Sequence, residues 1–157
     1  MNRFYFLAVI LVLGVLAISM VFAAARIAIF LDIPTLIILT VPSLALCLAT
    51  FPPRDIGRSF AAAFTRHAST EAELRTAAVF FRSLERYILL SGFIGALIGI
   101  ITILTVAELS NTEGVATGFA LLLLSVFYAL VLMLALAVPF RAAVDRKLAG
   151  IDRPSRA

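Results

Sequence analysis

Four uncharged apolar runs constrain the fold of this chain more than any other feature. They cover approximately residues 4–25, 33–51, 87–106 and 116–140, and none contains Asp, Glu, Lys, Arg or His. A helix that crosses the hydrocarbon core of a bilayer needs roughly 20 residues, with a range of about 17–25, and each run has this length. Hydrophobic residues make up 63% of the chain and charged residues 14%, against about 45–50% and about 25% in soluble domains. We therefore expect an integral membrane protein.

The runs are continuous rather than alternating, which indicates helices and not the strands of a membrane barrel. We predict an all-α integral membrane protein, a single membrane domain with four transmembrane helices. The first run raises a second possibility, because Arg3 precedes it and the three alanines at 23–25 resemble a signal-peptide cleavage site. The apolar stretch is longer than the roughly 7–15 residues of a signal-peptide core, and this length favours a retained span.

The positions of Lys and Arg predict the orientation of the helices. Twelve of the thirteen basic residues lie at the N-terminus, in residues 53–86 or in the tail 141–157, whereas the loops on the other side hold only Arg26. Basic residues accumulate on the cytoplasmic side of membrane proteins. We therefore predict that both termini and residues 53–86 are cytoplasmic. The same asymmetry explains the net charge of +4, so a nucleic-acid partner is not needed.

Residues that commonly carry chemistry are few. Cys47 is the single cysteine and lies inside the second run, and His67 is the single histidine and lies in the cytoplasmic segment. A lone thiol within a span indicates packing, and a lone histidine indicates a solvated side chain. The sequence contains no Ser/His/Asp set, no metal-ligand spacing and no phosphate-binding loop. We expect neither an enzyme nor a metal or cofactor site.

The cytoplasmic segment 53–86 predicts first a short helix. Pro52 and Pro53 end the second run, because proline cannot continue a helix and biases the residue before it away from helical angles. Asp55 is then placed to cap an amphipathic helix that extends to Phe64.

A second and much longer helix follows. Thr70 and Glu73 form a capping box, and no break separates this segment from the third run. We predict one helix from about Glu71 to beyond Ala107, whose first part extends into the cytoplasm. Its exposed arginines either lie near anionic membrane lipid or form a docking face for a partner. The apolar stripe that one face buries consists of Leu74, Ala77, Phe81, Leu84 and Ile88.

The third run contains three glycines in the stretch GFIGALIGIITI (92–103). Gly92, Gly95 and Gly99 lie on roughly one side of a helix, and Thr102 continues that side. In lipid, small residues at this spacing let two helices approach closely. We therefore predict a helix–helix contact here, either within one chain or between copies.

The fourth run carries Ser125 and Tyr128 among leucines, with Pro139 at its inner end. A serine within a span commonly returns its hydrogen bond to its own helix. Ion transport normally needs an acidic, basic or histidine side chain at depth in the membrane, and no run has one. If the chain conducts ions, a partner must supply the carboxylate. A substrate transporter should have broken helices near mid-membrane, and Pro42 is the only interior candidate.

Three stretches in order resemble the MotA/TolQ/ExbB family of proton-channel subunits, in particular its MotA-like branch. FLDIPTLIILTVPSLALCLATFP (30–52) resembles the start of that family's second span, in which Asp32 and Pro34 match. GFIGALIG (92–99) resembles the glycine pattern of its third span. LLLLSVFYALVLMLALAVPF (121–140) resembles its fourth span, with the same spacing from Tyr128 to Pro139.

This resemblance implies a subunit of a homopentameric ring in the bacterial inner membrane. Five copies would surround two copies of a single-span partner of the MotB/ExbD/TolR type, whose aspartate carries the proton. Proton flow, which supplies about 2.3 kcal/mol per charge per 100 mV, would drive a motor or stator. Residues that the resemblance implies to line the pore or face the partner are Gly92, Gly95, Ala96, Gly99, Thr102, Ser125, Val126, Tyr128 and Ala129.

The chain differs from the family pattern at four positions. Val126 stands where the family has a pore threonine, and Ser125 is the nearest hydroxyl. Ala96 stands where a threonine is common, Leu89 near the position of a proline, and Ala129 in place of a glycine. The differences at Val126 and Leu89 favour the alternative hypothesis, which is a non-conducting structural or assembly protein on the same scaffold.

Overall fold

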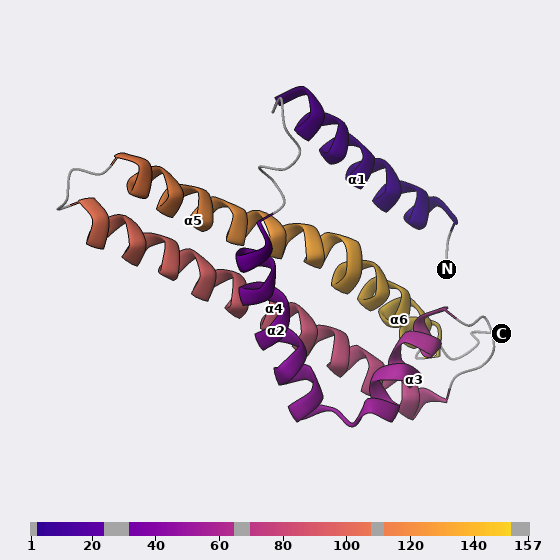
Figure 1. Ribbon diagram of the computed structural model, residues 1–157. Helices are drawn as coiled ribbons and strands as arrows, with labels where there is room; N and C mark the ends of the chain where they lie inside the picture. The colour runs from indigo at the N-terminus through magenta and orange to yellow at the C-terminus, as the bar shows by residue number, and fades with distance from the viewer. Residues whose placement is uncertain (1–2, 24–31, 65–69, 108–111, 152–157) are drawn as a thin grey trace.

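The computed structural model describes residues 3–23, 32–64, 70–107 and 112–151, and the regular structure among them is entirely helical (Figure 1). The predicted all-α class is therefore confirmed. Within these described ranges, three helical segments are long and apolar enough to cross a membrane, namely Ile33–Thr50, Glu71–Thr105 and Thr112–Ile151. The elements in chain order are α1 (Arg3–Ala23), α2 (Ile33–Thr50), α3 (Pro53–Phe64), α4 (Glu71–Ala107), α5 (Thr112–Leu132), the π-helix η2 (Met133–Ala137) and α6 (Val138–Ile151).

Helix α2 begins and ends where its sequence signals stand. Asp32 is its N-cap, and the carboxylate accepts hydrogen bonds from the backbone N–H of Thr35, at 3.1 Å, and from the Thr35 hydroxyl. Pro34 occupies the first turn, where a missing N–H costs nothing. Phe51 caps the other end in an extended conformation, and the helix runs through Pro42 without interruption. The motif Asp-Ile-Pro-Thr is thus a helix start.

Helix α4 is the predicted long helix, continuous from Glu71 to Ala107. Its first residue, Glu71, directly follows Thr70 of the capping box, and the Thr70 N–H donates to Glu73 Oε2 at 3.1 Å. An exposed pair between Glu71 and Arg75 follows on the next turn. All five residues of the predicted apolar stripe are buried, which confirms that face. The predicted continuation beyond Ala107 lies outside the described residues.

The last helix is longer than the apolar run that predicted it. Helix α5, η2 and α6 form one continuous rod from Thr112 to Ile151, so part of the expected tail 141–157 is helical. The π-helical turn of η2 directly precedes Pro139, and the Val138 N–H bonds to the Met133 carbonyl. Proline removes an N–H and crowds the carbonyl four residues earlier. A wider turn just before Pro139 gives that ring room inside a continuous helix.

Helix α3 starts earlier than the sequence analysis predicts. It begins at Pro53, and Asp55 lies within its first turn, so the prediction that Asp55 caps this helix is wrong. Proline fits the first helical position, because the N–H that it lacks has no partner there. The Asp55 carboxylate still lies near the positive end of the helix dipole, which stabilises it.

Aromatic rings pack α3 against α4 and α6 at one end of the molecule. Phe60 of α3 contacts Phe80, Phe81 and Phe140, with ring centroids 5.7, 5.4 and 5.3 Å apart. Lys147 of α6 donates to the carbonyls of Ala62 and Ala63, the last turn of α3, where a cation offsets the negative end of the dipole. This core holds the first half of α4 beside the start of α6.

The two long rods run side by side over most of their length, with α2 across them (Figure 1). Helix α4 packs most extensively on α5, and α2 packs on α4 and, less, on α5. Cys47 of α2 is buried, which agrees with a packing role, while His67 lies outside the described residues. Helix α1 meets η2 and α6.

Candidate functional site

Glycines make the closest contact between α4 and α5. A methyl group added at Gly99 would lie 2.6 Å from the Leu122 nitrogen and 2.8 Å from the Gly118 carbonyl oxygen, and one at Gly95 would lie 2.5 Å from Ser125 Oγ. Gly118 of α5 makes the reciprocal approach, 2.6 Å from Ile103. The glycines predicted to support close helix approach therefore pack within one chain, and Gly118 is a further member of this contact.

Ser125 lies inside this contact. It is 1% exposed, and its hydroxyl donates to the Leu121 carbonyl of its own helix at 2.7 Å. This is the hydrogen bond that a serine within a span commonly makes. Thr102 does the same on α4, donating to the Ile98 carbonyl at 2.9 Å. Both hydroxyls donate to carbonyls of their own helices.

Tyr128 connects α5 to the start of α2. The Asp32 N–H donates to the Tyr128 hydroxyl at 3.0 Å, and Tyr128 is buried. This bond joins residues 96 positions apart and brings together two predicted motif residues. Tyr128 lies in the middle of the fourth run (116–140), so α2 starts beside the middle of the α4–α5 pair rather than beside its end.

Hydroxyl side chains join α2 to α4 through hydrogen bonds that no motif in the sequence predicts. Ser43 Oγ donates to the Leu39 carbonyl at 2.7 Å and lies 2.9 Å from Ser91 Oγ, and Thr50 Oγ1 lies 2.8 Å from the Tyr87 hydroxyl. Interhelical hydrogen bonds between hydroxyls stabilise helix pairs in lipid by about 0.6 kcal/mol on average. These bonds fix α2 on the face of α4 away from the groove described next.

An apolar groove lies along the other side of the α4–α5 contact. It has a volume of about 210 Å³ and holds four of the predicted site residues, Gly92, Ala96, Val126 and Ala129. Gly92 and Ala129 also belong to the helix contact, where a methyl group at Gly92 would lie 2.6 Å from the Ala129 Cβ. We call this surface the α4–α5 groove, lined by Leu89, Gly92, Phe93, Ala96, Val126, Ala129 and Leu130.

The predicted site residues thus separate into two sets. Gly92, Ala96, Val126 and Ala129 line the α4–α5 groove. The others do not line this groove: they lie in the α4–α5 contact, at the start of α2 or elsewhere along the two rods. This second set consists of Gly95, Gly99, Thr102, Ser125, Tyr128, Asp32, Pro34 and Pro139.

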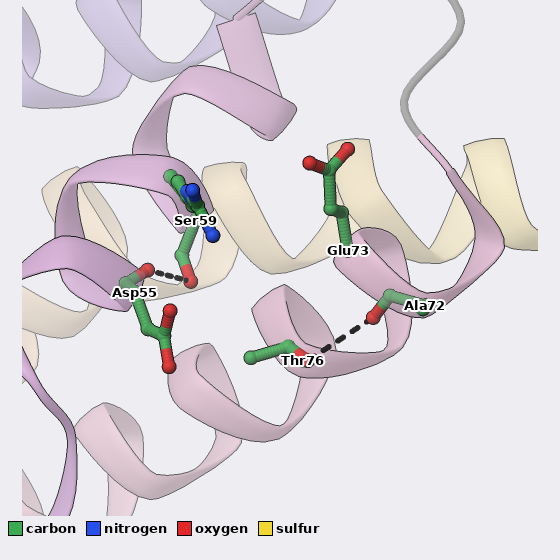
Figure 2. Close-up of a pocket in the computed structure, with 6 residues that line it drawn as sticks. Asp55, Ser59, Ala72, Glu73 and Thr76 are labelled. Carbon is green, nitrogen blue, oxygen red and sulfur yellow. Dashed lines mark hydrogen bonds between the residues drawn. The ribbon is translucent and has the colours of Figure 1, made fainter.

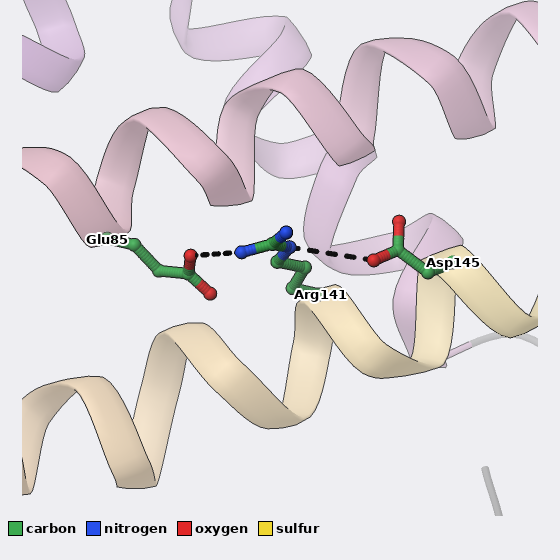
Figure 3. A network of polar contacts seen from close by, with 3 residues as sticks. All are labelled: Glu85, Arg141 and Asp145. Atoms are coloured by element: carbon green, nitrogen blue, oxygen red, sulfur yellow. Dashed lines mark hydrogen bonds and ion pairs between the residues drawn. The ribbon is translucent and has the colours of Figure 1, made fainter.

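A charged cleft that the sequence does not predict lies between the first half of α4 and the π-helical turn and first turns of α6, and Figure 3 shows its three charged residues. Arg141 Nη1 lies 2.5 Å from Glu85 Oε2, and Arg141 Nε lies 3.5 Å from Asp145 Oδ2. The Glu85 side chain is 13% exposed and that of Arg141 37%. We call this the Glu85 cleft, with a volume of about 320 Å³, lined by Glu85, Met133, Val138, Arg141, Ala142 and Asp145.

A smaller pocket of about 150 Å³ lies between α3 and the start of α4, and its lining includes Asp55, Arg58 and Glu73 (Figure 2). Ser59 donates to the Asp55 carbonyl at 2.7 Å and Thr76 to the Ala72 carbonyl at 3.0 Å. The Glu73 carboxylate accepts from the Thr70 N–H. These bonds stay within single helices and their caps, so the polar groups serve the local structure.

Comparison with known proteins finds no matching family model and no matching curated protein. In the part of the chain that the structure describes, no group of three or more His, Cys, Asp or Glu residues is placed to hold a metal ion. The α4–α5 groove and the Glu85 cleft are therefore the features on which a function can be argued.

Proposed function

We propose that this chain is a ring-forming subunit of a proton-motive-force-driven complex, packed around a single-span partner whose aspartate carries the proton. In this proposal the protein has four spans in a bacterial inner membrane, with both termini and the first part of α4 in the cytoplasm. The resemblance of residues 30–52, 92–99 and 121–140 to the MotA/TolQ/ExbB family motivates the proposal, and five chains would surround two partner chains.

The α4–α5 groove is the observation that carries this proposal. It lies between two helices that are long and apolar enough to span a membrane, and its lining is apolar, with Gly92, Ala96 and Ala129 among it. Small residues let a further helix approach closely in lipid, where van der Waals packing replaces the hydrophobic effect. A single-span helix is an occupant that fits such a surface.

The partner must also supply the acid. The four apolar runs hold no Asp, Glu, Lys, Arg or His, and a carboxylate in the middle of a membrane helix costs about 2.5–3.5 kcal/mol on insertion scales. A partner's aspartate placed against the groove would be shielded from lipid by α4 and α5. It would also be the only group at that depth able to bind and release a proton.

The groove itself supports one alternative. All seven residues that line it, Val126 among them, have apolar side chains or none, and Ser125 gives its hydroxyl to its own helix. A chain without a polar group in the groove is also suited to bind a helix without passing protons. The alternative is a non-conducting structural or assembly protein on the same scaffold.

Proton flux separates the two proposals. The purified complex of this chain with a single-span partner encoded beside it would be reconstituted in vesicles, and flux would be followed with a pH-sensitive dye. The leading proposal expects flux that disappears when the partner's membrane aspartate is replaced by asparagine. A stable complex with no flux in either form would favour the structural role, and failure of the two chains to associate would contradict both.

A further inference from the structure

Glu85 lies in line with the α4–α5 groove. Residues at positions i, i+4, i+7 and i+11 share one face of a helix, so Glu85 shares a face of α4 with Leu89, Gly92 and Ala96. On the facing rod, Val126 and Met133 are seven residues apart and line the groove and the Glu85 cleft respectively. The groove and the cleft therefore follow one another along the same side of the two rods, and we call this line the furrow.

Arg141 lies between two carboxylates, those of Glu85 and Asp145. Arg141 of α6 lies 2.5 Å from the Glu85 carboxylate and 3.5 Å from that of Asp145, one turn further along α6 (Figure 3). On α4 itself, Arg82 and Arg86 are exposed on either side of Glu85. Asp145 therefore offers the Arg141 guanidinium a second acceptor beside Glu85.

We propose that Glu85 accepts protons at the inner end of the furrow and releases them to the cytoplasm. This inference rests on the proposed function, in which the partner's carboxyl brings the proton into the groove. An O–H bond on the partner's carboxyl breaks and one on Glu85 forms, with water between them. Arg141 then turns to Asp145. When the Glu85 O–H bond breaks, the proton enters cytoplasmic water and the ion pair with Arg141 is restored.

The position of Glu85 supports this role over that of any other acid in the described ranges. Asp55 and Glu73 line the pocket between α3 and α4, and Glu71 is exposed and paired with Arg75. Asp32 caps α2 through bonds to Thr35. The Asp145 side chain is 40% exposed, and Glu113 is exposed in the first turn of α5. Among the acids of the described ranges, Glu85 alone combines a largely buried carboxylate with a place on the groove-bearing face of α4.

Flux through the reconstituted complex tests the inference with two isosteric variants of α4. Glu85→Gln removes the proton-accepting group and keeps a hydrogen-bond acceptor for Arg141. We expect it to lower flux by about 100-fold, as loss of an acid–base group commonly does, and to abolish the dependence of flux on internal pH. Glu73→Gln changes the same residue type outside the furrow and should leave flux and its pH profile as in the unmodified complex. Glu85→Asp should restore part of the flux.

Subunit composition, measured by native mass spectrometry on the same samples, keeps the outcomes apart. A Glu85→Gln complex that assembles fully and conducts like the unmodified one would overturn the inference. So would a Glu85→Gln complex that loses flux together with its subunits, because Glu85 would then only hold α4 to α6. If the unmodified complex assembles but shows no flux that depends on the partner's aspartate, the proposed function itself fails.

Discussion

Glycines, whose side chain is a single hydrogen atom, allow α4 and α5 to approach closely. At Gly99 the obstacle to a side chain is the backbone of α5, which cannot rotate away as a side chain can. The energy of the contact is van der Waals attraction between backbones, and it falls steeply with separation. The glycines, which lower intrinsic helix propensity, are retained here for packing.

We therefore predict that Gly99→Ala destabilises the protein, although alanine is the better helix former by about 1 kcal/mol. Overpacking costs about 1–3 kcal/mol, and this cost should exceed the gain in helix propensity. The unfolding temperature of the variant in detergent should therefore be lower than that of the unmodified protein. Gly57→Ala is the matched control, because a methyl group there meets nothing within 4 Å, and it should be neutral or stabilising. Equal melting temperatures for the two variants would refute the packing role of Gly99.

Asp32 provides a second prediction for a single residue. Its carboxylate satisfies the first turn of α2 through Thr35, so Asp32→Ala should reduce stability by about 0.5–2 kcal/mol. Asparagine is an equally good N-cap, and Asp32→Asn should retain most of the stability. Unfolding in a mixed detergent series measures both. A loss with asparagine as large as that with alanine would show that the charge of Asp32, and not the cap, matters.

The aromatic core accounts for how one element, α3, is held. Phe60 is a partly buried α3 ring that contacts three other rings, and its truncation should cost somewhat less than the about 3–5 kcal/mol of a fully buried phenylalanine. Phe60→Ala should therefore release α3 from α4 and α6, with faster amide hydrogen exchange in α3 than in α2. Phe64, which is more than half exposed and contacts Phe140, should give a smaller effect on truncation. Uniform exchange changes across all helices would contradict local release.

The sequence predicts those elements whose signals are local. The capping box at Thr70 and Glu73 and the stripe from Leu74 to Ile88 predict the course of α4 correctly, because both depend on spacing along one helix. The start of α3 is three residues earlier than predicted, because Pro53 and not Ile56 is the first helical residue. Where the signal is periodic or adjacent in the chain, the physics of one helix is enough.

Contacts between helices were predicted only in part. The glycines indicate a close approach but not its partner, and the structure shows the partner to be α5 of the same chain. The Glu85–Arg141 pair joins residues 56 apart, and the Asp32–Tyr128 bond joins residues 96 apart. No spacing rule connects such pairs, because they depend on how the helices pack.

At the scale of the whole molecule, the proposed function requires the α4–α5 groove to face a partner helix. Val126 lines the groove and is 43% exposed, so Val126→Trp should fill it and prevent copurification of the single-span partner while α4 and α5 stay packed. Leu123→Trp places the same ring three residues away on the same helix, at a position 62% exposed and outside the groove, and should leave copurification intact. Equal partner recovery with both variants would contradict docking in the groove.

The most direct test of the central claim is native mass spectrometry of the detergent-extracted protein together with its genetically adjacent single-span product. The proposed ring predicts a single assembly of five copies of this chain and two of the partner. Subunit loss on activation should release the chain as a monomer of 16.9 kDa. A protein that is extracted only as a monomer, with no bound partner, would contradict the ring and the function proposed for it.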